Sequence, residues 1–324
     1  MIASPLLLSL VLCCAPGAGG GGAGGDGGAV GDGGAPGDGG APGDGGAPGE
    51  TVDAFSYVLI ADPHVTGPGD HADRLQQAVD WVVDHRDDRH LELVFVLGDI
   101  AWGDGFDDAL AILEQLPVPW VPVLGDNPIQ AGDEQGFEDS FGPVLDALGD
   151  RLDGWVRTPR PVDDPVNGGQ ALLQNNAFDF GGMRFLSLDW NTRVRETGWG
   201  EMPDLHDFEG GTLPFLEEEL ARAEATGGKD ERMVLLTHMP MIEGPGSFDV
   251  EEGSTLEALL GPRASLVNAN HAGHLHFSAD DVWEECGLDV DVTDATWDDA
   301  VTIRVVDVRE DAARFYLEPE LIKL

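Results

Sequence analysis

Basic residues are scarce in this sequence, and lysine is almost absent. Of 324 residues, 17 are Lys or Arg and 61 are Asp or Glu, which gives a formal net charge of −44. The only lysines are Lys229 and Lys323. Such a charge repels the phosphate backbone of nucleic acids and the acidic surface of membranes. The composition therefore argues against a scaffold that binds nucleic acids.

Apolar residues are not scarce, because they make up 42% of the chain. That share is normal for a globular protein and too high for an acidic disordered one. We therefore expect most of the acidic residues on the surface of a folded domain. Since lysine is nearly absent, we also expect a halophilic protein. Salt would screen the repulsion between its acidic side chains, with a screening length of about 3 Å at 1 M.

Cysteines are few, and long apolar runs are missing. The first 12 residues, MIASPLLLSLVL, form a run that is too short to span a bilayer, which takes about 20 residues. It fits the apolar part of a signal peptide, although no Lys or Arg precedes it. Cys13 and Cys14 follow directly, as at a lipoprotein processing site, and Cys286 is the third cysteine. We expect residues 1–14 to be a signal peptide or lipoprotein signal, and a fold without disulfides.

A Gly-rich stretch follows, over residues 15–52. Its Asp-Gly-Gly-Ala-Pro-Gly repeat cannot bury apolar surface, so we expect a disordered linker. A flexible chain of this length spans about 35 Å on average. The sequence thus predicts an extracytoplasmic protein, secreted or held at the cell envelope by a lipid at Cys13 or Cys14. The linker would precede one domain over residues 53–324.

The domain shows an alternating pattern of strands and helices. Apolar runs predict strands at 56–61, 91–97, 120–124, 233–237, 264–268, 301–308 and 313–317, with a hairpin around Gly181 and Gly182. Apolar residues at helical spacing predict helices at 72–85, 106–116 and 213–225. Buried strands separated by helices indicate a layered α/β domain.

Polar side chains follow five of these strands. They are Asp62 and His64, then Asp99, then Asp126 and Asn127, then His238, and finally His274 and His276. Ligands bind at the carboxyl ends of strands in open α/β sheets. Imidazole and carboxylate donors without thiolate suit Mn, Fe or Zn. About seven ligands are too many for one metal ion and right for two, so the pattern predicts a site for two divalent or trivalent ions.

The order of these motifs resembles that of the calcineurin-like metallophosphoesterases. The likeness extends from about residue 56 to residue 276 and includes the hairpin at 178–189. It implies a layered metallophosphoesterase-like β-sandwich flanked by helices. It also implies a phosphoric ester hydrolase with a dinuclear centre, in which a metal-activated hydroxide attacks a phosphomonoester or a phosphodiester.

The same resemblance implies a role for each residue. Three residues would hold the first metal ion: Asp62, His64 and His276. Asp99 would bridge both ions. Two histidines would hold the second ion together with a residue of the loop after Gly125: His238 and His274.

The third motif departs from the family pattern. The family has Gly-Asn-His, whereas this chain has Gly125-Asp126-Asn127-Pro128. Aligned without gaps, Asp126 is the ligand and Asn127 replaces the His; shifted by one residue, Asn127 is the ligand. Both alternatives leave no His to stabilise or protonate the leaving oxygen. General acid catalysis of this kind raises the rate about 10²–10⁴-fold. We take Asp99 and Asn127 as the candidate catalytic residues.

A second departure concerns Trp102, which stands where the distantly similar purple acid phosphatases carry a tyrosine. An indole cannot supply a phenolate to iron, so we expect no purple charge-transfer band. His71, His206 and His271 are candidates to replace the missing His, but the sequence does not place them at the site.

The sequence thus predicts a monomeric phosphoesterase that acts on a small or macromolecular phosphoester. The alternative is an extracytoplasmic metal-binding surface protein that has the same fold and weak or no catalysis. The loops that would select a substrate carry no recognisable motif.

Overall fold

The computed structural model describes residues 51–194, 200–241, 248–298 and 300–324. The predicted signal segment, nearly all of the predicted linker, Cys13 and Cys14 lie outside these residues, so their roles stay predictions. In the described part of the chain, no helix is both long enough and apolar enough to cross a membrane.

The first of two large sheets has the strand order β14-β13-β1-β2-β3. Three of its strands run parallel: β1 (Val52–Ile60), β2 (Leu91–Leu97) and β3 (Trp120–Val123). Two antiparallel strands extend it: β13 (Thr302–Glu310) and β14 (Phe315–Lys323). The parallel strands are nearly continuous apolar runs because both faces of the sheet are covered.

The second large sheet has the order β11-β12-β10-β9-β8-β7-β4. Its parallel centre consists of β8 (Met183–Leu188), β9 (Met233–Thr237), β10 (Val267–Ala272) and β12 (Leu288–Val292). Antiparallel strands lie toward its edges: β4 (Asp153–Arg157), β7 (Asn176–Phe180) and β11 (Ala279–Trp283). A small separate sheet pairs β5 (Val162–Asp164) with β6 (Gly169–Ala171).

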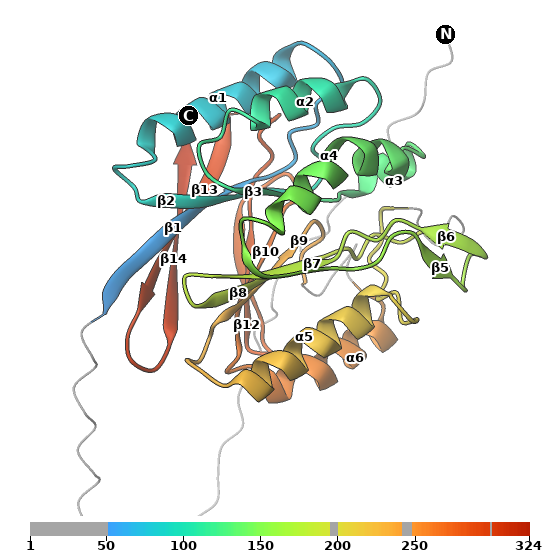
Figure 1. The fold of residues 1–324 in the computed structure, drawn as a ribbon, viewed down its shortest axis with the longest axis vertical. Coiled ribbons are helices and arrows are strands. Elements are labelled where there is room, and N and C mark those ends of the chain that lie inside the picture. The colour runs from blue at the N-terminus through green and yellow to red at the C-terminus, as the bar shows by residue number, and fades with distance from the viewer. Residues whose placement is uncertain (1–50, 195–199, 242–247, 299) are drawn as a thin grey trace, which may run out of the picture. The chain divides into compact units, whose positions relative to one another are not determined.

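Helices cover the outer faces of both large sheets (Figure 1). One pair covers the first sheet: α1 (Asp70–His85) and α2 (Gly105–Leu113). Another pair covers the second sheet: α5 (Thr212–Thr226) and α6 (Val250–Leu260). The short α3 (Asp126–Gln130) and the longer α4 (Glu134–Leu148) follow β3. The predicted α/β class, a β-sandwich flanked by helices, is confirmed.

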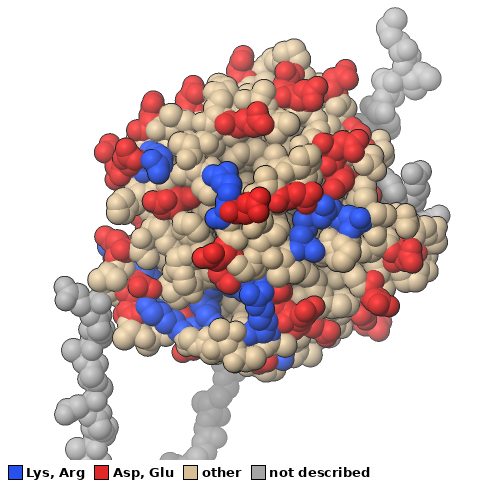
Figure 2. Space-filling model, viewed as in Figure 1, with Lys and Arg blue, Asp and Glu red and all other residues tan. Residues whose placement is uncertain are grey.

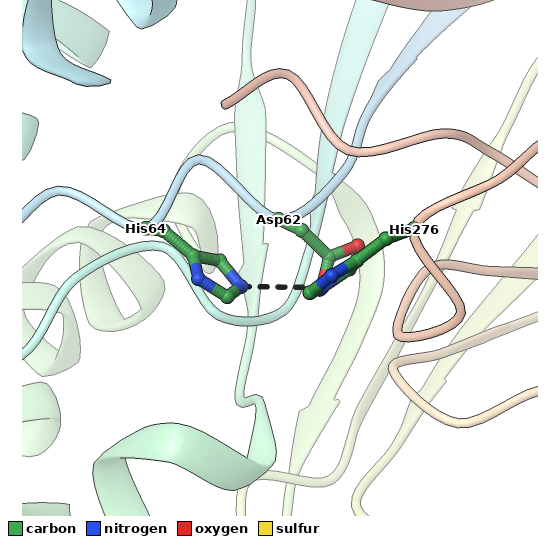
Figure 3. Close-up of side chains that lie close together, drawn as sticks. All are labelled: Asp62, His64 and His276. Atoms are coloured by element: carbon green, nitrogen blue, oxygen red, sulfur yellow. Dashed lines mark ion pairs between the residues drawn. The ribbon is translucent and has the colours of Figure 1, made fainter. Parts of the chain in front are cut away.

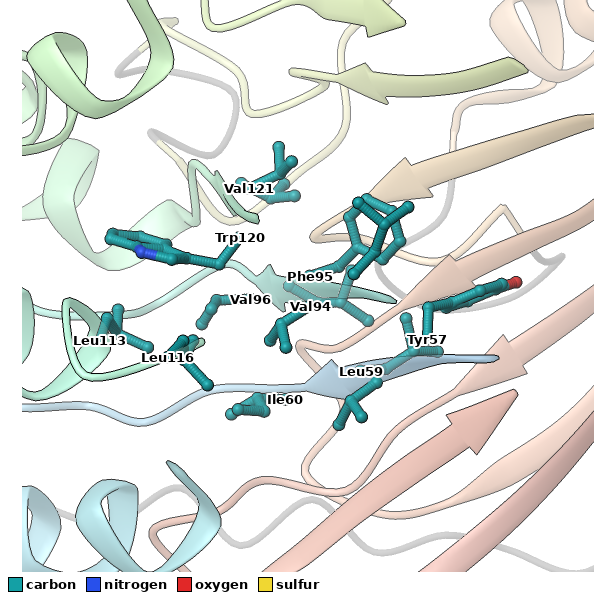
Figure 4. Close-up of a cluster of buried hydrophobic side chains, with 14 of the residues drawn as sticks. Tyr57, Leu59, Ile60, Val94, Phe95, Val96, Leu113, Leu116, Trp120 and Val121 are labelled. Carbon is teal, nitrogen blue, oxygen red and sulfur yellow. The ribbon is translucent and has the colours of Figure 1, made fainter. Parts of the chain in front are cut away.

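Aromatic side chains join the two sheets. The ring of Phe185, on β8, lies 5.5 Å from that of Tyr57 on β1 and 5.2 Å from that of Phe95 on β2. Figure 4 shows the cluster on the first sheet, where apolar side chains of β1, β2 and β3 lie beside those at the end of α2. Burying each such ring contributes about 1.5–3 kcal/mol, so this core holds the two sheets, and the loops at their ends, in a fixed relation.

Two predicted strands were misplaced, and one of them is the strand expected at 313–317, which begins at Phe315 and continues to Lys323. The strand expected at 264–268 begins only at Val267 and continues to Ala272, because Gly261–Arg263 forms a 3₁₀ turn after α6. The strand contains Asn268, Asn270 and His271, whose polar side chains hid it in the sequence. Asn270 is nevertheless buried and paired, since its Oδ1 accepts a hydrogen bond from the Met241 N–H at 2.9 Å.

Candidate metal centre

Loops after five strands meet at one end of the sandwich. They follow β1, β2 and β3 of the first sheet, and β9 and β10 of the second. Backbone hydrogen bonds join them within each sheet: the His64 N–H donates to the Asp99 carbonyl at 2.8 Å, and the Gly273 N–H donates to the His238 carbonyl at 3.0 Å. These bonds fix the candidate ligands relative to one another.

Two glycines permit this close approach. A Cβ at Gly98, whose φ is +86°, would overlap the ring of His238. A Cβ at Gly273 would overlap the carboxylate of Asp62. The glycines that precede Asp99 and His274 are therefore required by space, because a loop from one sheet presses against a ligand from the other.

The first group consists of Asp62, His64 and His276 (Figure 3). Oδ1 of Asp62 lies 3.7 Å from Nε2 of His64 and 3.5 Å from Nε2 of His276. Oδ1 of Asp62 and Nε2 of His64 are buried and have no hydrogen-bond partner among the described residues. Buried polar atoms without partners are rare. A metal cation bound between this oxygen and this nitrogen would satisfy both.

The second group consists of Asp126, His238 and His274. Oδ1 of Asp126 lies 2.8 Å from Nε2 of His238 and 3.3 Å from Nδ1 of His274. His238 is fully buried, and its Nδ1 lies 2.9 Å from the Leu97 carbonyl oxygen. That bond orients the ring and directs Nε2 to the second group, as outer hydrogen bonds of metal-binding histidines do.

Asp99 lies between the two groups. Its Oδ2 is 3.3 Å from Nε2 of His64, and its Oδ1 is 3.6 Å from Nε2 of His238. One carboxylate thus faces a histidine of each group, which is the position expected of a bridging ligand.

Asn127 occupies a different position from Asp126. Its backbone N–H donates to Oδ1 of Asp99 at 2.9 Å, and its side-chain amide donates to Oδ2 of Asp99. Asp126, in contrast, contacts both histidines of the second group. This geometry fits the alignment without gaps, in which Asp126 is the ligand and Asn127 stands where the family has its histidine.

The backbone is unusual at the same positions. Among the described residues other than glycine, eight have positive φ. Five of these are candidate ligands: Asp62, His64, Asp99, His274 and His276, with φ between 45° and 69°. A left-handed backbone conformation costs an L-residue of order 1–3 kcal/mol. Residues keep it where the surrounding structure imposes it, which is common at functional sites. The sharp turns direct successive side chains toward the centre.

Protons on two histidines offset part of the negative charge within the cluster. Burial disfavours the charged form of His64, but Asp62 and Asp99 outweigh burial and raise its pKa to about 9. Burial is likewise outweighed for His238, whose pKa is raised to about 10 by Asp99, Asp126 and Asp62. Burial is outweighed for Asp62 and Asp126 too, because the histidines that face these carboxylates lower their pKa. The buried carboxylates therefore attract cations, and metal ions would displace these protons.

The spacing of the donors suits metal ions. Ligands about 2.1 Å from one ion, at 90–109° to each other, lie about 3.0–3.4 Å apart. The separations between nitrogen and oxygen within the two groups run from 2.8 Å to 3.7 Å. The donors are imidazole and carboxylate without thiolate, since Cys286 is buried elsewhere, in the core beneath the second sheet. The residues present therefore fit a metal centre.

Of the other residues singled out in the sequence, two lie beside the candidate metal ligands and two lie away from them. Trp102 packs edge-on against His64, with ring centroids 5.2 Å apart. His71 lies beside the first group, where its Nδ1 is 2.7 Å from the His64 carbonyl oxygen. His206 and His271 are buried away from the cluster, paired with the Asn191 carbonyl and with Tyr57. The sequence reasoning missed Trp297, although it follows β12 at the same end of the second sheet.

Comparisons with known proteins identify the fold. No family model matches the chain, and no curated protein matches it. Among solved structures, a putative 5′-nucleotidase from Staphylococcus aureus matches with a TM-score of 0.51 and 14% identity, over 85% of this chain and 54% of that one. This chain thus spans about half the length of that protein. At this identity the likeness shows the fold alone, and it confirms the predicted one.

Two further structures are similar at lower scores. The sulfate thiohydrolase SoxB of Thermus thermophilus matches with a TM-score of 0.47 and 13% identity, over 84% of this chain and 57% of that one. GAP50, described as the anchor in the inner membrane complex of Plasmodium, matches with a TM-score of 0.45 and 10% identity, over 81% of this chain and 88% of that one.

Proposed function

We propose that this chain, which has the fold of the calcineurin-like metallophosphoesterases, is a metal-dependent hydrolase of phosphoric esters. The observation that carries the proposal is the position of Asp99, whose two oxygens face His64 of the first group and His238 of the second. Two contiguous groups of donors that share one carboxylate suit a pair of ions. When bound, two Mn, Fe or Zn ions would supply a water of lowered pKa and positive charge for the phosphoryl oxygens.

The chain's own residues would orient this centre. Asn127 holds both oxygens of Asp99 through two hydrogen bonds, which fixes the plane of the bridging carboxylate. Oδ2 of Asp62 accepts the His274 N–H at 2.9 Å, so Oδ1 remains free for a cation. These contacts hold two carboxylates of the cluster in place. Little rearrangement would then be needed on binding metal.

The preferred substrates would have good leaving groups. Asn127 stands where the family has a histidine, and an amide cannot transfer a proton to a leaving oxygen. General acid catalysis is worth about 10²–10⁴-fold, and it matters most for alkoxide leaving groups. We therefore propose that aryl phosphoesters are hydrolysed much faster than alkyl ones.

The test is turnover by the full chain in high salt. The protein is loaded with Mn²⁺, Zn²⁺ or Fe and assayed with p-nitrophenyl phosphate and bis(p-nitrophenyl) phosphate. His276→Ala should abolish turnover. His85→Ala is the matched control, because His85 stacks on Trp81 in α1, outside the cluster, and should leave turnover unchanged. Equal rates for the unaltered protein and His276→Ala would reject the proposal.

A second candidate function is metal binding without strong catalysis. It is favoured by the third motif, Gly125-Asp126-Asn127-Pro128, which has no histidine where the resemblance implies the family's proton donor. This candidate predicts two bound ions and no turnover of either aryl ester. Metal content does not separate the two functions, because both predict two bound ions. The turnover assay does separate them.

A further inference from the structure

The indole of Trp297 contacts both histidines of the first group. Its ring is stacked on that of His64, with centroids 5.2 Å apart and an interplanar angle of 25°. The ring of His276 meets the same indole edge-on, at 5.4 Å and 88°. A single side chain therefore touches two of the three candidate ligands of one metal ion.

The backbone that carries Trp297 is held from two sides. The Thr296 N–H donates to the carbonyl of Ala61 at 2.9 Å, and Ala61 directly precedes Asp62. Arg74, on α1, donates from Nε to the Thr296 carbonyl and from Nη2 to the Asp298 carbonyl, each at 2.8 Å. These bonds flank Trp297 in the chain and fix the indole relative to the third ligand of the group.

One histidine of the second group is oriented by a backbone carbonyl, and neither histidine of the first group is. His238 of the second group is oriented by the Leu97 carbonyl, the usual arrangement for a metal-binding histidine. Among the described residues, neither the ring of His64 nor that of His276 makes a hydrogen bond to a backbone carbonyl. Apart from the carboxylates of the cluster, their rings contact aromatic side chains and each other, with the two imidazole centroids 4.9 Å apart. The first group thus lacks the hydrogen bonds that would otherwise set the ring directions.

We infer that Trp297 is a positioning residue of the first metal group, where stacking replaces the missing hydrogen bonds. The inference rests on the proposed function, since it requires metal binding. The indole limits the rotation of both imidazoles, so that their Nε2 atoms converge on Oδ1 of Asp62. Loss of an outer contact of this kind typically lowers metal affinity 10–100-fold. The second group, which does not depend on the indole, should keep its affinity.

The experiment is a metal titration of the full chain in high salt, by calorimetry with Zn²⁺ and by visible absorption with Co²⁺. Trp297→Ala should weaken one of two binding events 10–100-fold, change the absorption of that site, and leave the other event within about twofold. Trp297→Phe keeps a flat ring and should restore most of the affinity. Trp81→Ala is the matched control, because Trp81 stacks on His85 at 4.4 Å and 15° in α1.

Each other outcome overturns the inference. Unchanged binding in Trp297→Ala, or failure of Trp297→Phe to restore affinity, would show that stacking does not orient the ligands. Equal weakening of both events would indicate a role in folding only. If the unaltered protein binds two ions, these results bear on Trp297 alone; if it binds none, the proposed function fails as well.

Discussion

Oδ1 of Asp126 lies 2.8 Å from Nε2 of His238, across the interface between the two sheets. Asp126 begins α3, and His238 follows β9, so the contact brings the third and fourth motifs of the sequence together. The neighbouring Asn127 turns to Asp99 instead. The geometry thus favours one of the two alignments that the sequence left open.

Substitution at these two positions should separate a ligand from an orienting residue. We predict that Asp126→Ala loses one metal ion of two, because it removes a carboxylate from the second group. Asn127→Ala should keep both ions and reduce turnover about tenfold or more, since Asp99 loses two donors. Metal content by mass spectrometry and initial rates check this. Loss of metal in Asn127→Ala with full retention in Asp126→Ala would favour the other alignment.

Removal of metal should destabilise the fold. Asp62, Asp99 and Asp126 are buried within one cluster, and without a metal ion the protonated rings of His64 and His238 offset their charge only in part. An ion present at 100 times its Kd stabilises a protein by about 2.7 kcal/mol. We predict that a chelator lowers the melting temperature of the unaltered protein. The same chelator should have little effect on Asp99→Ala. Equal melting with and without chelator in the unaltered protein would contradict this.

Salt should stabilise the domain. Figure 2 shows acidic side chains spread over one face, with basic ones gathered in a few places. A net charge of −44 destabilises the compact state by self-repulsion, which salt screens. We predict a melting temperature that rises between 0.1 M and 2 M NaCl. The control is the same titration at low pH, where most carboxylates are neutral and the rise should shrink. A melting temperature independent of salt would refute the idea.

A buried ion pair between Arg193 and Asp189 should make the stability of the fold depend on pH. Arg193 contacts both oxygens of Asp189, at 2.7 Å and 2.8 Å, and both side chains are buried. Burial alone would raise the pKa of Asp189, but the charge of Arg193 outweighs burial and lowers this pKa below its ordinary value. Because the folded pKa is the lower one, this stabilisation is present above about pH 4 and is lost as the pH falls through the folded pKa.

Asp189→Asn tests that pair. We predict a loss of about 3–5 kcal/mol at neutral pH, because a buried guanidinium loses its main partner, and a smaller loss in acid. Urea unfolding at several pH values measures both. Asp53→Asn is the control: Asp53 pairs with Arg309 on the surface, and its loss should be undetectable. A loss for Asp189→Asn that is the same at all pH values would contradict the assignment.

The sequence predicted the fold and most of the candidate site because the relevant residues follow apolar strands. Asp62, Asp99 and His238 each come within two residues of a strand end, so their convergence followed from the parallel order of strands. The choice between Asp126 and Asn127 did not follow, because adjacent residues of a short helix point in different directions. Trp297 was missed because its role depends on contacts with His64 and His276 that are distant in sequence.

The central claim is that this chain holds two metal ions bridged by Asp99. Anomalous X-ray diffraction from crystals grown with Mn²⁺ measures this directly. We predict two anomalous peaks about 3.5–4 Å apart, one beside Asp62, His64 and His276 and the other beside Asp126, His238 and His274. A single peak at this place, or none, would contradict the account.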